Sequence, residues 1–314
     1  MGRWILNPIL SVLMPAFREE RKIFIEAIES VLEQTFVDFE LILIIDDPGN
    51  IELIKLTEEY AQKDSRIRLL INRDNVGLVN SLNRAISLAR GKYFCRMDAD
   101  DISYPERFKR QIQEIEKHNL DFVGAKVDVV DSYGAFLYSS EGLPHSPQVI
   151  SRALRWNNCV PHSTWMGKRE VFKHGYRNID LCEDYDFLLR ASLANYRIGN
   201  CSEPLLAYRM TDRSISRSNL YKQYLGQVYL SYWYSKKEIV QESSLESWIC
   251  NNYSSKKNEQ YAKANILFNE GMKNISRKKA YGVWCLLKIP FVSIQYCGKL
   301  KRLFMAGILG FRDK

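Results

Sequence analysis

The chain has 314 residues, of which 26% are charged and 12% are aromatic. This length can bury the core of one large domain or two small ones, and the composition excludes an intrinsically disordered chain. The formal net charge of +8 is uneven, because residues 215–314 hold 17 Lys/Arg against 6 Asp/Glu (+11) while the remainder holds 28 against 31 (−3). A basic last third favours an anionic partner, which is a membrane surface, a nucleic acid or an acidic polymer.

Strand and helix patterns alternate over the first 130 residues, which predicts an α/β fold with a doubly wound, mostly parallel sheet and right-handed crossovers. Further along, the pattern is less regular, and from residue 215 onward it predicts helices. The predicted strands are 9–14, 41–45, 67–71, 93–97, 121–130, 136–138 and one near Ile198, and the predicted helices are 19–34, 51–60, 79–89, one with Phe108, Ile112 and Ile115 on its face, 171–175 and 185–195.

The cysteines and the N-terminal residues indicate the cellular compartment in which the protein is expected. There are seven cysteines, an odd number, and none forms a C-x-x-C pair, which favours free thiols in a reducing compartment. Residues 1–8 lack the apolar run and cleavage site of a signal peptide, and no uninterrupted apolar stretch of about 18 residues predicts a membrane-spanning helix. We therefore expect a cytoplasmic protein.

Three carboxylates, Asp98, Asp100 and Asp101, directly follow the fourth predicted strand. Side chains alternate along a strand, so Asp98 and Asp100 point the same way, and like charges held this close repel unless a cation lies between them. Hard oxygen ligands suit Mg²⁺ or Mn²⁺, and α/β proteins bind ligands at the carboxyl edge of the sheet. The alternative is a turn and a helix cap, with Ser103 and Glu106 as a capping box.

Four motifs then follow one another in a recognisable order: SVLMPAF at 11–17, SVLEQTF at 30–36, FELILIIDD at 39–47 and RMDADD at 96–101. In this order they resemble the family 2 glycosyltransferases over roughly residues 9–210. The resemblance implies the GT-A fold, inverting and typically metal-dependent transfer, and a role in bacterial surface polysaccharide assembly. It also implies a GT-A domain at 1–214, with a nucleotide-sugar half at about 1–120 and an acceptor half at about 121–214, and a helical C-terminal extension at 215–314.

The resemblance further implies which residues hold the donor. Asp47 would accept a hydrogen bond from a ring N–H of the base, which suits uracil, while Asp98 would face the ribose or the metal. Glu19 and Asn83 have simpler interpretations, as a charge favourable at a helix N-terminus and as an exposed helical amide. The implied nucleotide-binding residues are Pro15, Ala16, Phe17, Glu19, Asp47, Asn83 and Asp98, and the implied metal ligands are Asp98 and Asp100.

A second acidic group, Glu183-Asp184-Tyr185-Asp186, heads a predicted helix, and the resemblance makes Asp184 the catalytic base. A sugar hydroxyl needs a base because it is a poor nucleophile until its proton is removed. The alternative is that these charges only complement a helix dipole.

Three further residues, His162, Arg209 and Arg213, would contact the diphosphate or the acceptor by the same resemblance. A structural role is the alternative for His162. Many relatives place a metal-binding His where this chain has Thr211, so the third protein ligand is left open, with water or Asp212 as substitutes.

The predicted function is transfer of a hexose-type sugar from a nucleotide diphosphate donor, UDP-linked, to a hydroxyl of a glycan or lipid-linked glycan, with Mn²⁺ or Mg²⁺ as cofactor. Two alternatives stay open: a nucleotidyltransferase, which would need a glycine- and cation-rich loop where residues 15–19 read PAFRE, and a sugar-nucleotide-binding protein without transferase activity. Nucleic acid is not expected as a partner, because the basic excess lies outside the α/β part and no binding motif accompanies it.

The basic last third mixes cations with large apolar side chains at 276–291 and 299–309. Such segments can lie in a membrane interface, with Trp284 and Phe291 buried and Lys/Arg facing the headgroups. A helical subdomain with a basic outer face explains the pattern equally well. Peripheral attachment at the cytoplasmic face of the membrane, beside a lipid-linked acceptor, is therefore a hypothesis.

Overall fold

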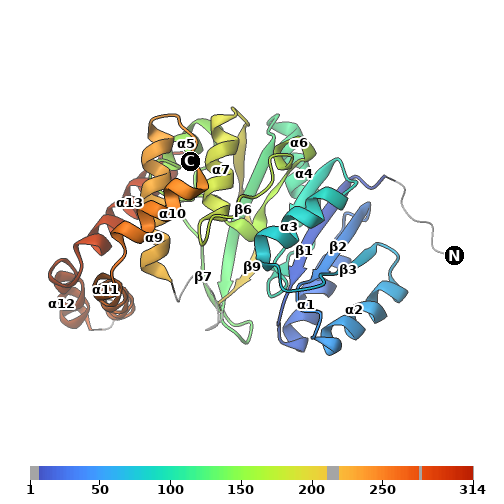
Figure 1. Ribbon diagram of the computed structural model, residues 1–314, viewed down its shortest axis with the longest axis horizontal. Helices are drawn as coiled ribbons and strands as arrows, with labels where there is room; N and C mark the ends of the chain where they lie inside the picture. Colours follow the sequence, from blue (N-terminus) through green and yellow to red (C-terminus); the bar gives the residue numbers. More distant parts are fainter. Residues whose placement is uncertain (1–6, 211–218, 276–277, 314) are drawn as a thin grey trace.

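A nine-stranded sheet forms the centre of the computed structural model, which describes residues 7–210, 219–275 and 278–313 (Figure 1). One half of the sheet is parallel, in the order β3-β2-β1-β4. Its strands are β1 (Leu10–Ala16), β2 (Phe39–Ile45), β3 (Ile67–Ile71) and β4 (Tyr93–Arg96). Because parallel strands share a direction, their carboxyl ends meet at one edge of the sheet, where Ala16 lies beside Ile45.

Helices cover both faces of this parallel half. Leu13 and Ile42 belong to a core cluster with residues of α3 (Gly77–Leu88), whereas Val12 and Leu41 belong to a second cluster with residues of α1, α2 and α4. Strands buried on both faces read as continuous apolar runs, which is why the sequence predicts them. The helices of the second cluster are α1 (Arg21–Leu32), α2 (Ile51–Lys63) and α4 (Arg107–Lys117).

The other half of the sheet is mixed. Its strands are β5 (Ile102–Ser103), β6 (Phe122–Val130), β7 (Phe136–Ser139), β8 (Met166–Lys168) and β9 (Ile198–Arg209). β8 pairs antiparallel with both β4 and β6. β5 pairs antiparallel with β9, β7 pairs antiparallel with β6, and β6 is parallel to β9. The predicted α/β fold is confirmed, and the parallel arrangement is confined to the first half. Strands as short as β5 and β8 show no periodicity, so the sequence does not reveal them.

The capping-box alternative for Ser103 is wrong. Ser103 lies in β5, and α4 begins at Arg107 without a side-chain cap. The buried amide of Gln34 instead holds this segment: its nitrogen donates to Ser103 Oγ at 3.2 Å and to the Tyr104 carbonyl at 2.7 Å, and its oxygen accepts from the Phe108 N–H at 3.1 Å. The segment that follows the acidic cluster is therefore held against α1.

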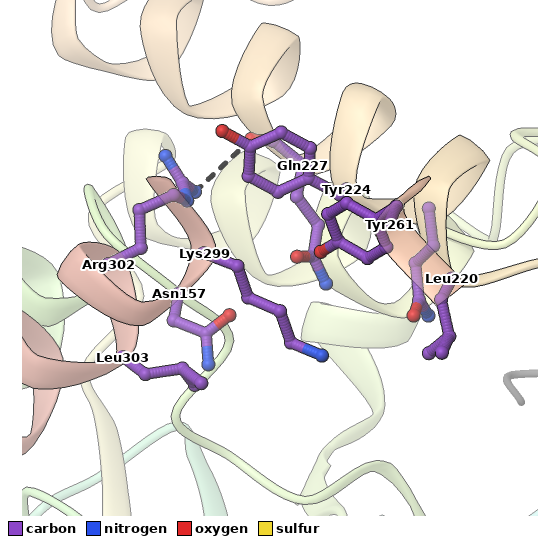
Figure 2. A pocket seen from close by; sticks show the side chains of 9 residues that line it. Asn157, Leu220, Tyr224, Gln227, Tyr261, Lys299, Arg302 and Leu303 are labelled. Carbon is purple, nitrogen blue, oxygen red and sulfur yellow. Dashed lines mark hydrogen bonds between the residues drawn. The ribbon is translucent and has the colours of Figure 1, made fainter. Parts of the chain in front are cut away.

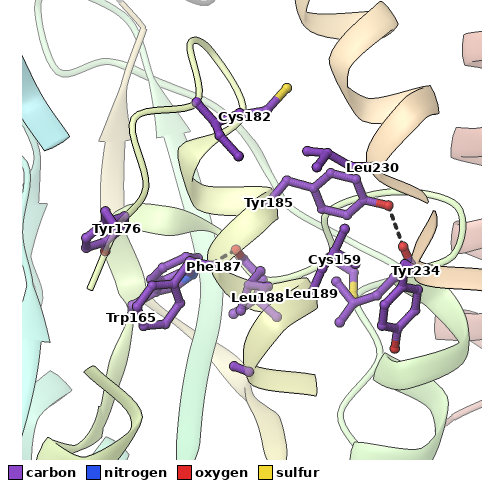
Figure 3. Close-up of a cluster of buried hydrophobic side chains, with 14 of the residues drawn as sticks. Cys159, Trp165, Tyr176, Cys182, Tyr185, Phe187, Leu188, Leu189, Leu230 and Tyr234 are labelled. Carbon is purple, nitrogen blue, oxygen red and sulfur yellow. Dashed lines mark hydrogen bonds between the residues drawn. The ribbon is translucent and has the colours of Figure 1, made fainter. Parts of the chain in front are cut away.

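The described C-terminal residues are mostly helical, as predicted. The helices are α9 (Leu220–Ser235), α10 (Glu242–Asn252), α11 (Ser255–Asn274), α12 (Lys279–Val292) and α13 (Ile294–Phe311). They continue the core of the α/β part, since Leu230 and Tyr234 of α9 pack near Tyr185 of α7 (Glu183–Leu193) (Figure 3). Asp313 anchors the far end by accepting the backbone N–H groups of His145 and Ser146, each at 2.7 Å.

The structure can be compared with the predictions about the domain boundary, the cysteines and membrane-spanning helices. The expected boundary between residues 214 and 215 lies within 211–218, outside the described residues. All seven cysteines are unpaired. Across the three described segments, none of the helices combines the length and the apolarity needed to cross a bilayer.

Candidate active site

Three carboxylates converge just beyond β4. One oxygen from each of Asp98, Asp100 and Asp101 lies within 4.8 Å of the other two. The backbone leaves the strand at Arg96 and turns, so Asp101 joins the pair that strand alternation alone predicts. The cluster forms at the carboxyl edge of the sheet, where the sequence places it.

The three carboxylates are largely buried and repel one another, and both properties favour a bound cation between them. Burial, followed by the charge of Asp98, raises the pKa of Asp100 to about 6, and burial with both neighbouring charges raises the pKa of Asp101 well above its usual range. Oδ1 of Asp101 accepts from the Arg209 N–H at 2.9 Å, but its buried Oδ2 has no hydrogen-bond partner. An unsatisfied buried acceptor costs about 1–3 kcal/mol. Hard carboxylate oxygens in a like-charged group, one of them unpartnered, match the ligand preference of Mg²⁺ and Mn²⁺.

Arg96 is a buried cation at the centre of the site. Its guanidinium pairs with Asp98 and is 2% exposed, and its Nε and Nη1 atoms have no hydrogen-bond partner. Burial alone would lower the pKa of Arg96, but the charge of Asp98 raises it overall. Its positive charge also lowers the pKa values of Glu183 and Asp184 relative to what burial alone would produce. Arg96 therefore links the triad electrostatically to the second acidic group.

Asp184 lies in the first turn of α7, where two hydrogen bonds orient its carboxylate. Oδ2 accepts from the Asn158 amide at 2.8 Å and Oδ1 from the Tyr185 N–H at 2.6 Å. Burial raises the pKa of Asp184, although both hydrogen bonds and Arg96 oppose the shift. Burial and the charge of Asp184 raise the pKa of Glu183 to about 7. A carboxylate with a raised pKa is a stronger base than an exposed one, as proton abstraction requires.

Tyr176 supplies a second link between the two acidic groups. Burial is the main cause that raises its pKa, and the charges of Asp184 and Asp98 both add to the increase. The pKa of this one phenol is thus raised by carboxylates from the end of β4 and from the start of α7. The fold brings these two segments together although they lie far apart in the sequence.

The residues predicted to hold the nucleotide lie around the end of β1. Pro15 and Ala16 are buried within the strand, and Phe17 follows it with the Arg18 guanidinium 4.7 Å from its ring centre. Asp47 follows β2, and its carboxylate accepts from Arg18 Nε at 2.8 Å. That hydrogen bond is the main cause that lowers the pKa of Asp47.

Glu19 belongs to the surroundings of the metal cluster. Its carboxylate accepts from the Phe17 N–H at 2.8 Å. Burial raises its pKa to about 7, and the charges of Asp100 and Asp98 contribute to the increase. Glu19 is therefore a further acidic group near the triad, and it precedes α1, which begins at Arg21.

Three predicted residues have structural partners. Both amide atoms of Asn83 bond to the Tyr176 backbone, at 2.9 and 2.8 Å, so the exposed-amide alternative is wrong. His162 lies 2.9 Å from the Tyr176 hydroxyl, and burial together with the charge of Arg96 lowers its pKa well below the usual range. Arg209 pairs with Glu26 at 2.6 Å and donates to the Asp100 carbonyl at 2.9 Å, which supports the acidic turn. Thr211, Asp212 and Arg213 lie outside the described residues.

Three residues of the site carry no role in the predictions: Arg96, Asn158 and Tyr176. Asp101 is predicted as part of the acidic cluster but not as a metal ligand. Arg96 and Asp101 stand inside the RMDADD motif, so adjacency to the aspartates is a usable signal. Asn158 and Tyr176 belong to segments without regular structure, and only their contacts with Asp184 and His162 reveal them.

Comparison with known proteins identifies the family. The model described as Glycosyl transferase family 2 matches residues 11–175. The O-antigen biosynthesis glycosyltransferase WbnJ of Escherichia coli is 32% identical over 217 residues, which cover 68% of this chain and 84% of the relative. The Escherichia coli protein WfgD, a UDP-Glc:α-D-GlcNAc-diphosphoundecaprenol β-1,3-glucosyltransferase by name, is 29% identical over 218 residues, which cover 68% and 82%. The chain belongs to glycosyl transferase family 2, so its enzyme class is glycosyltransferase.

A solved structure supports the fold independently. The structure of S. aureus TarS 1–349 in complex with UDP-GlcNAc matches with a TM-score of 0.59 at 17% identity, over 96% of this chain and 91% of that chain. At this identity the likeness concerns the fold, and it confirms the predicted GT-A architecture with helices toward the C-terminus.

Proposed function

We propose that this enzyme transfers a sugar from a UDP-sugar to a hydroxyl of a glycan or lipid-linked glycan, with inversion at the anomeric carbon and with Mn²⁺ or Mg²⁺ as cofactor. The observation that carries the proposal is that the buried Arg96 forms an ion pair with Asp98 of the triad, while its charge also acts on Asp184 of α7. Donor and acceptor chemistry can then occur in one place.

On the donor side, the uridine would lie against Pro15, Ala16 and Phe17, with Asp47 accepting from the uracil N–H. Asp98, Asp100 and Asp101 would hold the cation, which when bound neutralises charge on the departing diphosphate. The unpartnered Nε and Nη1 atoms of Arg96 are suited to the same charge. His162, held neutral by burial, would add a hydrogen bond rather than a charge.

On the acceptor side, Asp184 would remove the proton of the attacking hydroxyl. The Asn158 amide and the Tyr185 N–H keep its carboxylate in one orientation, so little rearrangement is needed before attack. In-line displacement from the side opposite the diphosphate inverts the anomeric configuration.

The relatives support a setting in polysaccharide assembly. WbnJ is named for O-antigen biosynthesis, and the name of WfgD includes a UDP-Glc donor and a diphosphoundecaprenol-linked acceptor. We extend both features to this chain as proposals: a UDP-sugar donor and a lipid-linked acceptor, with assembly of an O-antigen, capsule or exopolysaccharide as the process.

An exposed apolar and basic face on α12 and α13 supports peripheral contact with an anionic membrane, on the cytoplasmic side. Phe291 is 91% and Leu287 67% exposed, and Lys288 lies 3.4 Å from the Trp284 ring centre. Residues 278–313 contain seven Lys/Arg and one Asp. Figure 1 shows α12 at the end of the molecule away from the parallel half of the sheet. Cations beside exposed aromatic rings suit an interface of anionic headgroups.

Membrane contact is tested with phosphatidylglycerol vesicles at low salt. The double variant Trp284→Ser/Phe291→Ser removes two large apolar side chains, and burying a side chain of this kind fully contributes about 1.5–3 kcal/mol. The affinity for vesicles should therefore fall at least tenfold. Tyr133→Ser is the matched control, because Tyr133 is 92% exposed on the β6–β7 turn. Equal affinity of the double variant and the control would favour the ordinary helical subdomain.

The transferase proposal is tested with purified protein, a panel of UDP-sugars and Mn²⁺. Thermal stabilisation by one UDP-sugar, with slow release of UDP and faster release when acceptor is added, is the expected result. Stabilisation without any turnover would favour the sugar-nucleotide-binding alternative.

A further inference from the structure

A small polar pocket lies among the C-terminal helices, outside the site described above. Figure 2 shows the side chains that line it. Its volume is about 170 Å³. Pockets for drug-sized ligands span about 300–1,000 Å³, so this one suits a small group rather than an oligosaccharide. It is lined by Asn157, Leu220, Gln223, Tyr224, Gln227, Tyr261, Lys299, Arg302 and Leu303.

The charge of the pocket is positive and uncompensated. Lys299 and Arg302 line it from neighbouring turns of α13, and no carboxylate is among the lining residues. Arg302 donates to the Ser231 hydroxyl at 2.7 Å and to the Gln227 carbonyl at 3.3 Å. These neutral partners leave the guanidinium charge available to an anion.

Lys299 is the more informative of the two cations. Its amino group lies 5.0 Å from the Tyr296 ring centre, and within the described segments it makes no ion pair with a carboxylate. Lys299 is half-buried, and this burial lowers its pKa. A partly buried cation without a counter-ion loses hydration, and a bound anion would compensate for that loss.

The pocket adjoins the segments that carry the proposed base. Asn157 precedes Asn158, whose amide bonds to Asp184 at 2.8 Å. A second lining residue, Gln223, donates its amide to the Leu181 carbonyl at 3.1 Å, two residues before α7 begins. A ligand in the pocket is thus connected at two points to the Asp184 region.

We propose that this pocket binds the phosphate or diphosphate of a lipid-linked acceptor, and this inference rests on the proposed transferase function. Two cations, amide groups and tyrosines provide donors for phosphate oxygens, and the volume matches such a group. The apolar chain would continue over Leu303, which is 40% exposed, and Phe304, which is 66% exposed. The acceptor sugar would then be held beside Asp184, with its lipid directed along α13.

The test measures binding of farnesyl diphosphate by calorimetry, in EDTA so that no metal draws the diphosphate to the donor site. Lys299→Gln should weaken binding at least tenfold. Lys301→Gln is the matched control, because Lys301 is exposed on the same helix and carries the same charge, and it should change affinity less than twofold. Lys299→Gln loses the contact of the amino group with the Tyr296 ring and also removes a half-buried charge, so its melting temperature should stay close to that of the wild type.

Three outcomes would overturn the assignment. Equal weakening by Lys299→Gln and Lys301→Gln would mean non-specific charge attraction. Inorganic pyrophosphate binding as tightly as farnesyl diphosphate would mean a free-anion site. Loss of phosphatidylglycerol vesicle binding in Lys299→Gln, with farnesyl diphosphate affinity unchanged, would mean a phospholipid headgroup site.

The failure of this inference can be separated from the failure of the proposed function. UDP affinity in the presence of Mn²⁺ is measured on the same three proteins, and it should be equal in all of them because the pocket lies away from the triad. Absent UDP binding in the wild type would refute the donor assignment, whatever the farnesyl diphosphate result.

Discussion

The two acidic groups of the site differ in how their carboxylates are supported. The triad beyond β4 holds three carboxylates within 4.8 Å of one another and leaves the buried Oδ2 of Asp101 without a partner. Asp184, by contrast, has a hydrogen bond to each oxygen, and burial is the main cause of its raised pKa. The first arrangement is suited to gaining a cation, and the second to gaining a proton.

The largest expected effect comes from removing the proposed base. Asp184→Asn keeps the size of the side chain but cannot accept a proton, so the rate of sugar transfer should fall by about 10²–10⁴-fold, while UDP affinity with Mn²⁺ stays within twofold. UDP release and calorimetry measure the two quantities. Asp180→Asn, an exposed position three residues from the start of α7, is the control. Transfer at the wild-type rate in Asp184→Asn would assign the base elsewhere.

The complementary change is made in the triad. Asp100→Ala should lower UDP affinity at least tenfold when Mn²⁺ is present and leave the weak metal-free affinity unchanged, because the carboxylate acts through the cation. Calorimetry with and without Mn²⁺ provides the measurement, and Asp74→Asn, an exposed carboxylate after β3, is the control. If the metal-dependent affinity survives, Asp100 is not a ligand.

The pH dependence separates the groups further. A base acts as its ionised form, so transfer should decrease as the pH falls through the raised pKa of Asp184. Burial, together with the charge of Asp184, raises the pKa of Glu183 to about 7, so Glu183 is mostly uncharged at lower pH, where the acidic limb lies. Glu183→Gln keeps the side chain uncharged and should therefore leave the acidic limb of the rate profile in place. A limb that moves to lower pH would show that Glu183 is charged while Asp184 titrates.

A shift of the acidic limb to higher pH is expected from Asn158→Ala. The Asn158 amide bonds to the ionised carboxylate and lowers its pKa, so its loss should raise the pKa of Asp184 and move the acidic limb to higher pH, with a severalfold lower rate at neutral pH. The rate profile from pH 5 to 8 measures the shift. A limb that moves to lower pH, or does not move, would contradict this account of the base.

The first half of the fold was predictable because its signal is local. β1 and β2 are buried along their whole length, so their apolar runs appear directly in the sequence. Asp47 and Asp98 directly follow such runs, and the shared edge of parallel strands places them by geometry. In the second half, β5 and β8 contain two and three residues, too few to show a period, and their pairing depends on strands distant in sequence.

The sequence by itself determined the family, the α/β class and the acidic segments, because buried strands and ordered motifs are written in consecutive residues. Only the tertiary structure decided which of those groups meet. It paired Arg96 with Asp98 and brought its charge to bear on Asp184, assigned the Asn83 amide to the Tyr176 backbone, and placed Lys299 and Arg302 in one pocket. Such contacts depend on long-range packing and on the cost of burying charge, and neither is encoded in the spacing of neighbouring residues.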